Sequence, residues 1–185
     1  MKATAFADVK RYLAEGTLVT SKGVEKAVLE TIAAFLNSPT DGTLIIGALE
    51  RRVPFFDATT QTWHEKVRGF PEYGAYLCLG NELDLDALRR GRGGGISSWD
   101  TYQRHVQDII RRSFDRNPMM WVSASREVFR DKDFTRVSVR HPTVNWYYLK
   151  DDAGTLHVRE GNTTRGLVGS EADDYRAAFP RVVSG

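Results

Sequence analysis

The sequence of 185 residues predicts a compact mixed domain of helices and strands. Three observations predict it: an amphipathic helix followed by a buried strand over residues 22–49, a second amphipathic helix after residue 97, and two antiparallel hairpins after that helix. A hydrophobic content of 41% and an aromatic content of 11% are ample for a packed core. At this length one domain is the default, so we expect residues 1–185 to form a single domain with an elaborated insertion at about 51–97.

The first helix is predicted over Lys22–Asn37. Its apolar positions recur at spacings of four, four and three: Val24, Val28, Ile32 and Phe35. That spacing places them on one face of a helix. Ser21 or Thr20 is expected to cap the helix, with Glu25 near the positive end of its dipole.

A strand follows this helix. Pro39 ends the helix, because the residue before a proline is driven out of the helical region. A strand is predicted over Thr43–Leu49, because its run Leu44–Ile46 between Gly42 and Gly47 is short, branched and apolar without alternation, as is typical of a strand buried on both faces. Residues 1–20 fit either a strand or a helix. The aromatic stretch 53–74 is expected to be an insertion that packs against the rest of the domain. A strand is expected after it, over Gly74–Leu79.

The second helix is predicted from Ser97 or Ser98 to Phe114. Its apolar face comprises Tyr102, Val106, Ile109, Ile110 and Phe114, and its outer face carries Arg104, Arg111 and Arg112. A short helix over Ser170–Phe179, with Ser170 as its N-cap, ends the fold.

Two hairpins are expected between these helices. Met119–Ser125 and Phe134–Arg140 alternate as antiparallel strands, with Thr135, Val137 and Val139 on one face. Trp146–Lys150 and Thr155–Arg159 flank a polar turn and are predicted to pair with each other.

Composition and charge exclude several classes of protein. The 26 basic and 24 acidic residues give a net charge of +2, and most of the bases are arginines after residue 88. The single cysteine, Cys78, excludes an intramolecular disulfide and fits a buried structural thiol. No window approaches the 18 apolar residues of a membrane span. We therefore expect a soluble protein in the reducing cytoplasm, with no membrane contact.

Common cofactor motifs are missing. The glycines of 91–95 lack the lysine and hydroxyl of a P-loop, so they fit a mobile loop or an arginine-assisted anion site before the second helix. No pair among the histidines has zinc-ligand spacing: His64, His105, His141 and His157. No serine lies in a nucleophile elbow. Haem, flavin and zinc are not expected.

The segment Val158–Arg165 is the most distinctive local feature. A strand ends there in a turn with two arginines, an asparagine and two threonines: Arg159, Asn162, Thr163, Thr164 and Arg165. Such groups can hydrogen-bond oxyanions. They can equally stabilise the loop itself, through hydrogen bonds from their polar side chains to groups within it (the stitched-loop interpretation). Composition leaves both interpretations open.

Three segments in order resemble Schlafen-type AlbA-like domains. Val28–Asn37 with Gly42–Gly47 resembles the family's helix, alanine-phenylalanine-x-asparagine and glycine-threonine-leucine-isoleucine-glycine core. Val158–Arg165 resembles its closing arginine and glycine-asparagine-threonine-threonine-arginine signature, and Phe6–Lys10 resembles its opening strand. The resemblance spans about residues 6–179, with 51–97 its most divergent part.

The resemblance implies an α+β domain in which a mixed, largely antiparallel sheet packs with two main helices and a short C-terminal helix. It implies binding to RNA or DNA, in members of bacterial defence or stress pathways. A basic surface would then hold phosphates, with Arg89, Arg90, Arg92, Arg111, Arg112, Arg159, Asn162, Thr164 and Arg165 as the expected contacts.

Some members of this family are metal-dependent endoribonucleases that cleave tRNA-like RNA with three acids. By position, Asp8 and Glu50 match two of these acids and Lys10 matches the family's lysine, whereas the third acid falls on Ala3. The resemblance thus implies Mg²⁺ or Mn²⁺ on Asp8 and Glu50, with catalysis by Asp8, Lys10 and Glu50. A third hypothesis is a regulatory or assembly module that pairs with a copy of itself or a protein partner through the aromatic insertion at 53–79.

Overall fold

The computed structural model describes residues 2–3, 19–50, 55–57, 62–64, 72–73, 76–78, 99–129, 132–161 and 163–181. The helices are α2 (Val19–Leu36), α4 (Trp99–Ser113), α5 (Ser170–Ala178) and the 3-10 turn η1 (Lys150–Asp152). The strands are β1 (Lys2–Ala3), β2 (Gly42–Ile46), β3 (Ala48–Glu50), β4 (Phe55–Asp57), β5 (Thr62–His64), β6 (Glu72–Tyr73), β7 (Tyr76–Cys78), β8 (Val122–Phe129), β9 (Lys132–Val139), β10 (Leu156–Glu160) and β11 (Thr163–Leu167).

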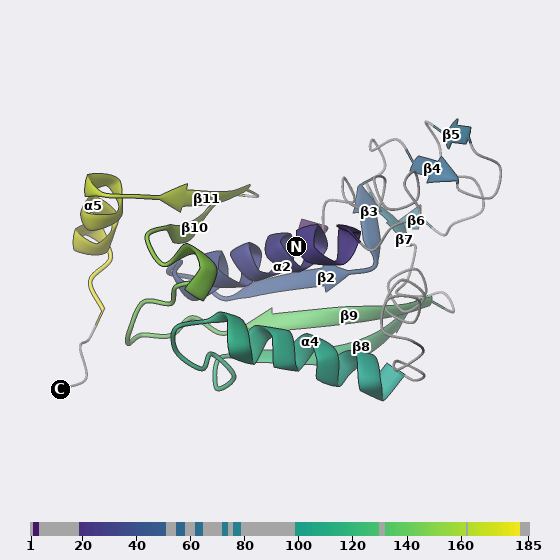
Figure 1. The fold of residues 1–185 in the computed structure, drawn as a ribbon, viewed down its shortest axis with the longest axis horizontal. Coiled ribbons are helices and arrows are strands. Elements are labelled where there is room, and N and C mark those ends of the chain that lie inside the picture. The colour runs from purple at the N-terminus through teal and green to yellow at the C-terminus, as the bar shows by residue number, and fades with distance from the viewer. Residues whose placement is uncertain are drawn as a thin grey trace.

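A four-stranded sheet in the order β1-β2-β9-β8 forms the centre of the molecule. β1 runs parallel to β2, and the other neighbours are antiparallel. α2 and α4 cover one face of this sheet, the β10–β11 hairpin and α5 lie beyond one end of it, and β3 lies beyond the other (Figure 1). The predicted α+β class, with a largely antiparallel sheet, is confirmed.

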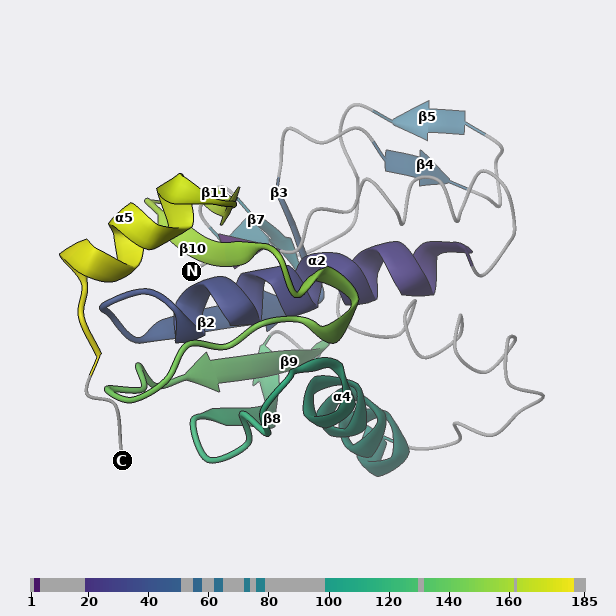
Figure 2. The ribbon, with the colours of Figure 1, turned by 60° about the vertical axis from the view of Figure 1, so that its left-hand side comes forward.

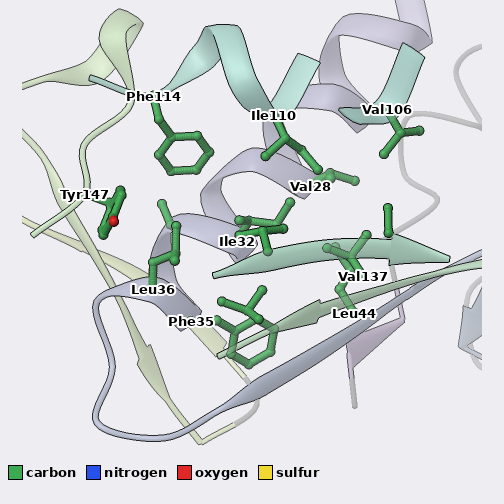
Figure 3. Close-up of a cluster of buried hydrophobic side chains, with 14 of the residues drawn as sticks. Val28, Ile32, Phe35, Leu36, Leu44, Val106, Ile110, Phe114, Val137 and Tyr147 are labelled. Carbon is green, nitrogen blue, oxygen red and sulfur yellow. The ribbon is translucent and has the colours of Figure 1, made fainter. Parts of the chain in front are cut away.

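The core lies between the two helices and the sheet. Ile32 and Leu36 of α2 meet Ile110 of α4 and Phe114, the residue after α4, above Val137 of β9 (Figure 3). All five side chains are essentially inaccessible to solvent. Each buried aliphatic or aromatic side chain contributes about 1.5–3 kcal/mol through removal of apolar surface from water. The apolar face predicted for the second helix is the face that α4 buries.

α2 begins earlier than the sequence indicates. It starts at Val19, so Thr20 and Ser21 lie within the helix and do not cap it, and Glu25 lies beyond the first turn. The predicted caps are therefore wrong. Serine and threonine cost well under about 1 kcal/mol in a helix interior, so they do not stop a helix that can extend further.

The strand predicted over Thr43–Leu49 is two strands. Gly47 between them has a φ of 106°, a conformation that side chains with a Cβ rarely adopt. β2 belongs to the central sheet, whereas β3 pairs with β7, which confirms the strand expected within Gly74–Leu79. Only one face of β2 is fully buried, since Thr43 and Ile45 are partly exposed. The expectation of burial on both faces is thus wrong.

The hairpin β8–β9 is confirmed, with a turn tighter than expected because Phe129 pairs with Lys132. The second predicted hairpin is wrong, because β10 pairs with β11 and not with residues 146–150. The backbone of Tyr147 is instead bonded by the Asn37 side chain, and that of Tyr148 by Asp115. These partners occupy the groups that a strand pairing would need.

The C-terminal helix is present with a different cap. Gly169, with a φ of 55°, precedes α5, and Ser170 is its first helical residue. No side chain caps this end. The expected N-cap at Ser170 is therefore wrong, because the left-handed glycine turns the chain into the helix one residue earlier.

Candidate functional site

The C-terminal end of α2 faces β10, and a buried asparagine joins the two. Asn37 is 1% exposed. Its Nδ2 donates to the carbonyl oxygens of Tyr147 at 2.8 Å and His157 at 3.1 Å, and its Oδ1 accepts from the Tyr147 amide at 2.9 Å. One side chain thus satisfies three backbone groups from two other segments. Figure 2 shows α2 lying between the central sheet and β10.

Arg159 lies against the same end of the helix. Its amide donates to Ser38 Oγ at 2.8 Å, and its guanidinium lies 5.0 Å from the centre of the Phe35 ring. Its Nη atoms donate to the Gly161 carbonyl at 2.9 Å and Thr164 Oγ1 at 3.2 Å, whereas its buried Nε has no hydrogen-bond partner among the described residues. Burial lowers the pKa of Arg159.

Two of the segments that carry the family resemblance meet here: Phe35 lies in α2 with Asn37 directly after its end, and Arg159 and Thr164 lie in the hairpin. The structure brings the two segments into contact. Their contacts within the chain favour the stitched-loop interpretation of Val158–Arg165. The oxyanion interpretation stays a prediction.

Arg165 projects from β11 between two carboxylates. Its Nη atoms are 2.8 Å from Glu160 and 2.8 Å from Glu171, and both contacts are exposed. These hydrogen bonds and charges raise the pKa of Arg165. A phosphate here would compete with two carboxylates for one guanidinium.

The arginines on the outer face of α4 make fewer contacts with other described residues than the arginines of the hairpin do. Arg111 has one ion pair, 3.7 Å from Asp108, and Arg104 donates to the carbonyl of Asp100. Arg112 is exposed and has no partner within the described ranges. Arg111 and Arg112 lie in the last turn of the helix, where cations complement its dipole.

Several predicted site residues lie outside the described residues: Asp8, Lys10, Arg89, Arg90, Arg92 and Asn162. Glu50 ends β3, and only its backbone is described. Ala3 pairs with Ile45, and β1 also contacts β3. Where side chains are described, no three acidic, histidine or cysteine residues gather in a way that could hold a metal ion.

Two residues that the sequence did not single out contribute to these junctions. Arg181 donates to the Leu36 carbonyl at 2.8 Å and lies 4.1 Å from the centre of the Trp146 ring, so it caps α2 from the far end of the chain. Burial lowers its pKa to about 10. His105 of α4 is buried, 3.7 Å from Glu25 of α2. Neither residue has a local sequence signal for its contacts, because Glu25 lies 80 residues from His105, and Leu36 and Trp146 lie 145 and 35 residues from Arg181.

The fold and these junctions define an α+β domain that carries arginines on the outer face of α4 and on the β10–β11 hairpin. The chain matches no protein-family model and none of the curated proteins. Within the described ranges, no helix has the length and apolar character that crossing a membrane requires.

Two solved structures are similar to it. The crystal structure of the DIP2311 protein from Corynebacterium diphtheriae is 16% identical over 85% of this chain, with a TM-score of 0.46, and this chain spans 20% of that one. The second is the solution structure of an N-terminal domain from Nitrosomonas europaea. Its parent protein is named as related to the ATP-dependent DNA helicase RecG. That domain is 15% identical to this chain, with a TM-score of 0.44. The match spans 91% of this chain and 83% of that domain. Both likenesses are too distant to argue function from.

Proposed function

We propose that this chain is a nucleic-acid-binding domain that holds the phosphates of RNA or DNA on the outer face of α4. One observation carries the proposal: Arg111 and Arg112 are both exposed, and among the described residues they make one ion pair, from Arg111 to Asp108 at 3.7 Å. Arginine presents a planar fork of donors suited to phosphate oxygens. The arginines of the preceding segment, Arg89, Arg90 and Arg92, are proposed as further contacts.

Secondary phosphate contacts in this proposal come from the hairpin, through Arg159, Asn162, Thr164 and Arg165. To reach a phosphate, Arg159 would give up its bonds to Gly161 and Thr164, and Arg165 would leave Glu160 and Glu171. Breaking such contacts offsets part of any gain from a new one. The resemblance to Schlafen-type AlbA-like domains supports binding to nucleic acid. Two of the segments that carry this resemblance, the one that ends at Asn37 and the one that begins at Val158, are in contact in the fold.

The test compares two variants with the same loss of charge, Arg111→Gln/Arg112→Gln and Arg159→Gln/Arg165→Gln. In a fluorescence-anisotropy titration of labelled RNA and DNA at low salt, we expect the α4 variant to bind about tenfold or more weakly. Arg126→Gln is the control, because Arg126 is held bidentately by Asp133. A larger loss in the hairpin variant would move the contact to the hairpin, and equal binding in all proteins would overturn the proposal.

A second candidate is a metal-dependent endoribonuclease that uses Asp8, Lys10 and Glu50. The contact between β1 and β3 favours it, since it brings the start of the chain near the strand that ends at Glu50. The donor set does not fit fully, because Ala3 supplies no carboxylate and two carboxylates hold Mg²⁺ or Mn²⁺ weakly.

Cleavage of tRNA in manganese by the wild type, Asp8→Ala and Glu50→Ala tests this candidate. Loss of cleavage in both variants would support it. Equal cleavage in all three would indicate a contaminating nuclease and exclude these residues.

The regulatory or assembly hypothesis for residues 53–79 is tested by the mass of the chain in solution, measured by light scattering with and without that insertion.

A further inference from the structure

The face of the central sheet opposite the helices carries a row of hydroxyls. Thr43 of β2 pairs with Ser138 of β9, which pairs with Ser123 of β8. Their strand neighbours Leu44, Val137 and Ala124 point into the core. Because side chains alternate between the faces of a sheet, the three hydroxyl residues point away from the core.

Two arginines flank this row, Arg136 in β9 and Arg140 directly after its last residue, where the Arg140 amide still donates to the Trp121 carbonyl of the neighbouring segment. Arg136 and Arg140 lie two residues before and two residues after Ser138, so the three share one face. The side chain of Arg136 is 48% exposed, with Glu127 3.7 Å away. Arg140 donates to the Met120 carbonyl at 2.9 Å and lies 5.9 Å from the centre of the Trp121 ring. It has no carboxylate partner among the described residues, so its charge is not compensated there.

The spacing and chemistry of this face suit a chain of phosphates. Alternate residues of a strand are roughly 7 Å apart, so residues 136, 138 and 140 offer cation, hydroxyl and cation at regular intervals. Serine hydroxyls donate to phosphate oxygens, and arginines add charge. Ser123 and Ser125 are exposed, and their side chains are short enough to let a polymer approach the sheet closely.

Among the described residues, this face offers no exposed ring beside the hydroxyl row on which a base could stack; Phe129, which is 37% exposed, lies six residues from Ser123 at the far end of β8. Phe134 is 4% exposed, and Arg140 lies over the Trp121 ring. Sheets that read the bases of single strands use exposed aromatic rings for stacking. Contact here would therefore be with the sugar–phosphate backbone, and a width of three strands, roughly 10 Å, suits a single strand.

We propose that the hydroxyl–arginine face formed by Thr43, Ser123, Arg136, Ser138 and Arg140 binds the phosphodiester backbone of a single nucleic-acid strand without regard to its bases. The inference rests on the proposed function, and it assigns a second surface on the side of the molecule away from the face formed by α2 and α4. The strand would contact α4 and this sheet face at separate points along its length.

Anisotropy titrations of the full chain with labelled oligouridylate and oligothymidylate at low salt test the inference. Arg136→Gln/Arg140→Gln should weaken binding about tenfold and make the slope of log K against log salt shallower by about 1.4, the value for two lost contacts with a single strand. Ser123→Asp should also weaken binding, because it places a carboxylate in the row. Ser170→Asp adds the same charge at the start of α5 and serves as the matched control.

The outcomes separate this inference from the proposed function. If the sheet variants bind like the wild type while Arg111→Gln/Arg112→Gln binds weakly, the sheet face is not a contact and the α4 proposal stands. If the wild type does not bind either strand at low salt, both fail. Weaker binding in the sheet variants, with unchanged thermal unfolding and an unaffected control, supports the inference. The two strands distinguish RNA from DNA.

Discussion

Asn37 joins three parts of the fold through one amide group. Its three hydrogen bonds tie the end of α2 to the segment at Tyr147 and to β10, and no water reaches it. The sequence contains Asn37 within the motif that resembles the family, but periodicity cannot show what it contacts, since its partners lie 110 and 120 residues away.

Replacement of Asn37 by alanine should therefore destabilise the protein by about 3 kcal/mol, because buried backbone groups would lose their partners. Urea unfolding followed by circular dichroism measures this change. Asn117→Ala is the matched control: Asn117 is exposed, and among the described residues it bonds only the nearby Met119 amide, so we expect a loss of about 1 kcal/mol or less. Equal losses in the two variants would contradict the role given to Asn37.

Gly42 is the second residue that the packing requires. A Cβ at this position would lie 2.0 Å from Cδ1 of the Phe35 ring, which is itself buried. Gly42→Ala should cost about 1–3 kcal/mol or more through overpacking. Gly154→Ala, where nothing lies within 4 Å, should be close to neutral. Thermal unfolding of both variants measures the two losses of stability. A Gly42→Ala variant as stable as the wild type would show that Phe35 can move aside.

Asp152 makes stability depend on pH. The Thr155 hydroxyl, which donates to it at 2.6 Å, and His157 beside it lower the pKa of Asp152 below its usual 3.8. The unfolded state then binds more protons as the pH falls through this range, so the contribution is present above pH 3.8 and is lost below it.

The stability difference between the wild type and Asp152→Asn should accordingly shrink as the pH falls below about 4. Urea unfolding of both proteins from pH 7 downwards measures it. A difference that stays constant across this range would contradict the assignment of the pKa shift to these contacts.

At the scale of elements, sequence periodicity located the helices and the β8–β9 hairpin and failed where long-range contacts decide. The spacing of Ile32, Phe35 and Leu36 predicts α2, because the core that they fill requires one apolar face. The break at Gly47 and the pairing of β10 with β11 could not be predicted in this way. The first depends on a left-handed glycine, and the second on the side chains of Asn37 and Asp115, which bond the backbone of Tyr147 and Tyr148.

The end of α2 is also tied to the last described segment of the chain. Arg181 donates to the Leu36 and Asn145 carbonyl oxygens, at 2.8 and 2.5 Å, and covers the Trp146 ring. Arg181→Ala should cost about 1–3 kcal/mol, because two carbonyls lose a charged donor. Hydrogen exchange should show faster exchange in the last turn of α2. Unchanged exchange there would mean that water replaces Arg181 without loss.

At the scale of the whole molecule, exposed arginines lie on the outer face of α4 and on the opposite face of the central sheet, and those of the β10–β11 hairpin are engaged by neighbouring groups. Of the candidate site, the exposed pair Arg111 and Arg112 could be predicted from helix periodicity. The partners of Arg159 and Arg165 could not, since Phe35 and Glu171 become neighbours only in the folded chain. The placement of Asp8 and Lys10 stays a prediction.

The salt dependence of binding tests the central claim most directly. Phosphate contacts by Arg111 and Arg112 require that log K for RNA or DNA falls linearly with log salt, with a slope of about −1.4 or steeper for a single strand. The account predicts such a slope for the wild type and a slope shallower by about 1.4 for Arg111→Gln/Arg112→Gln. Binding that is independent of salt, or no binding at low salt, would contradict it.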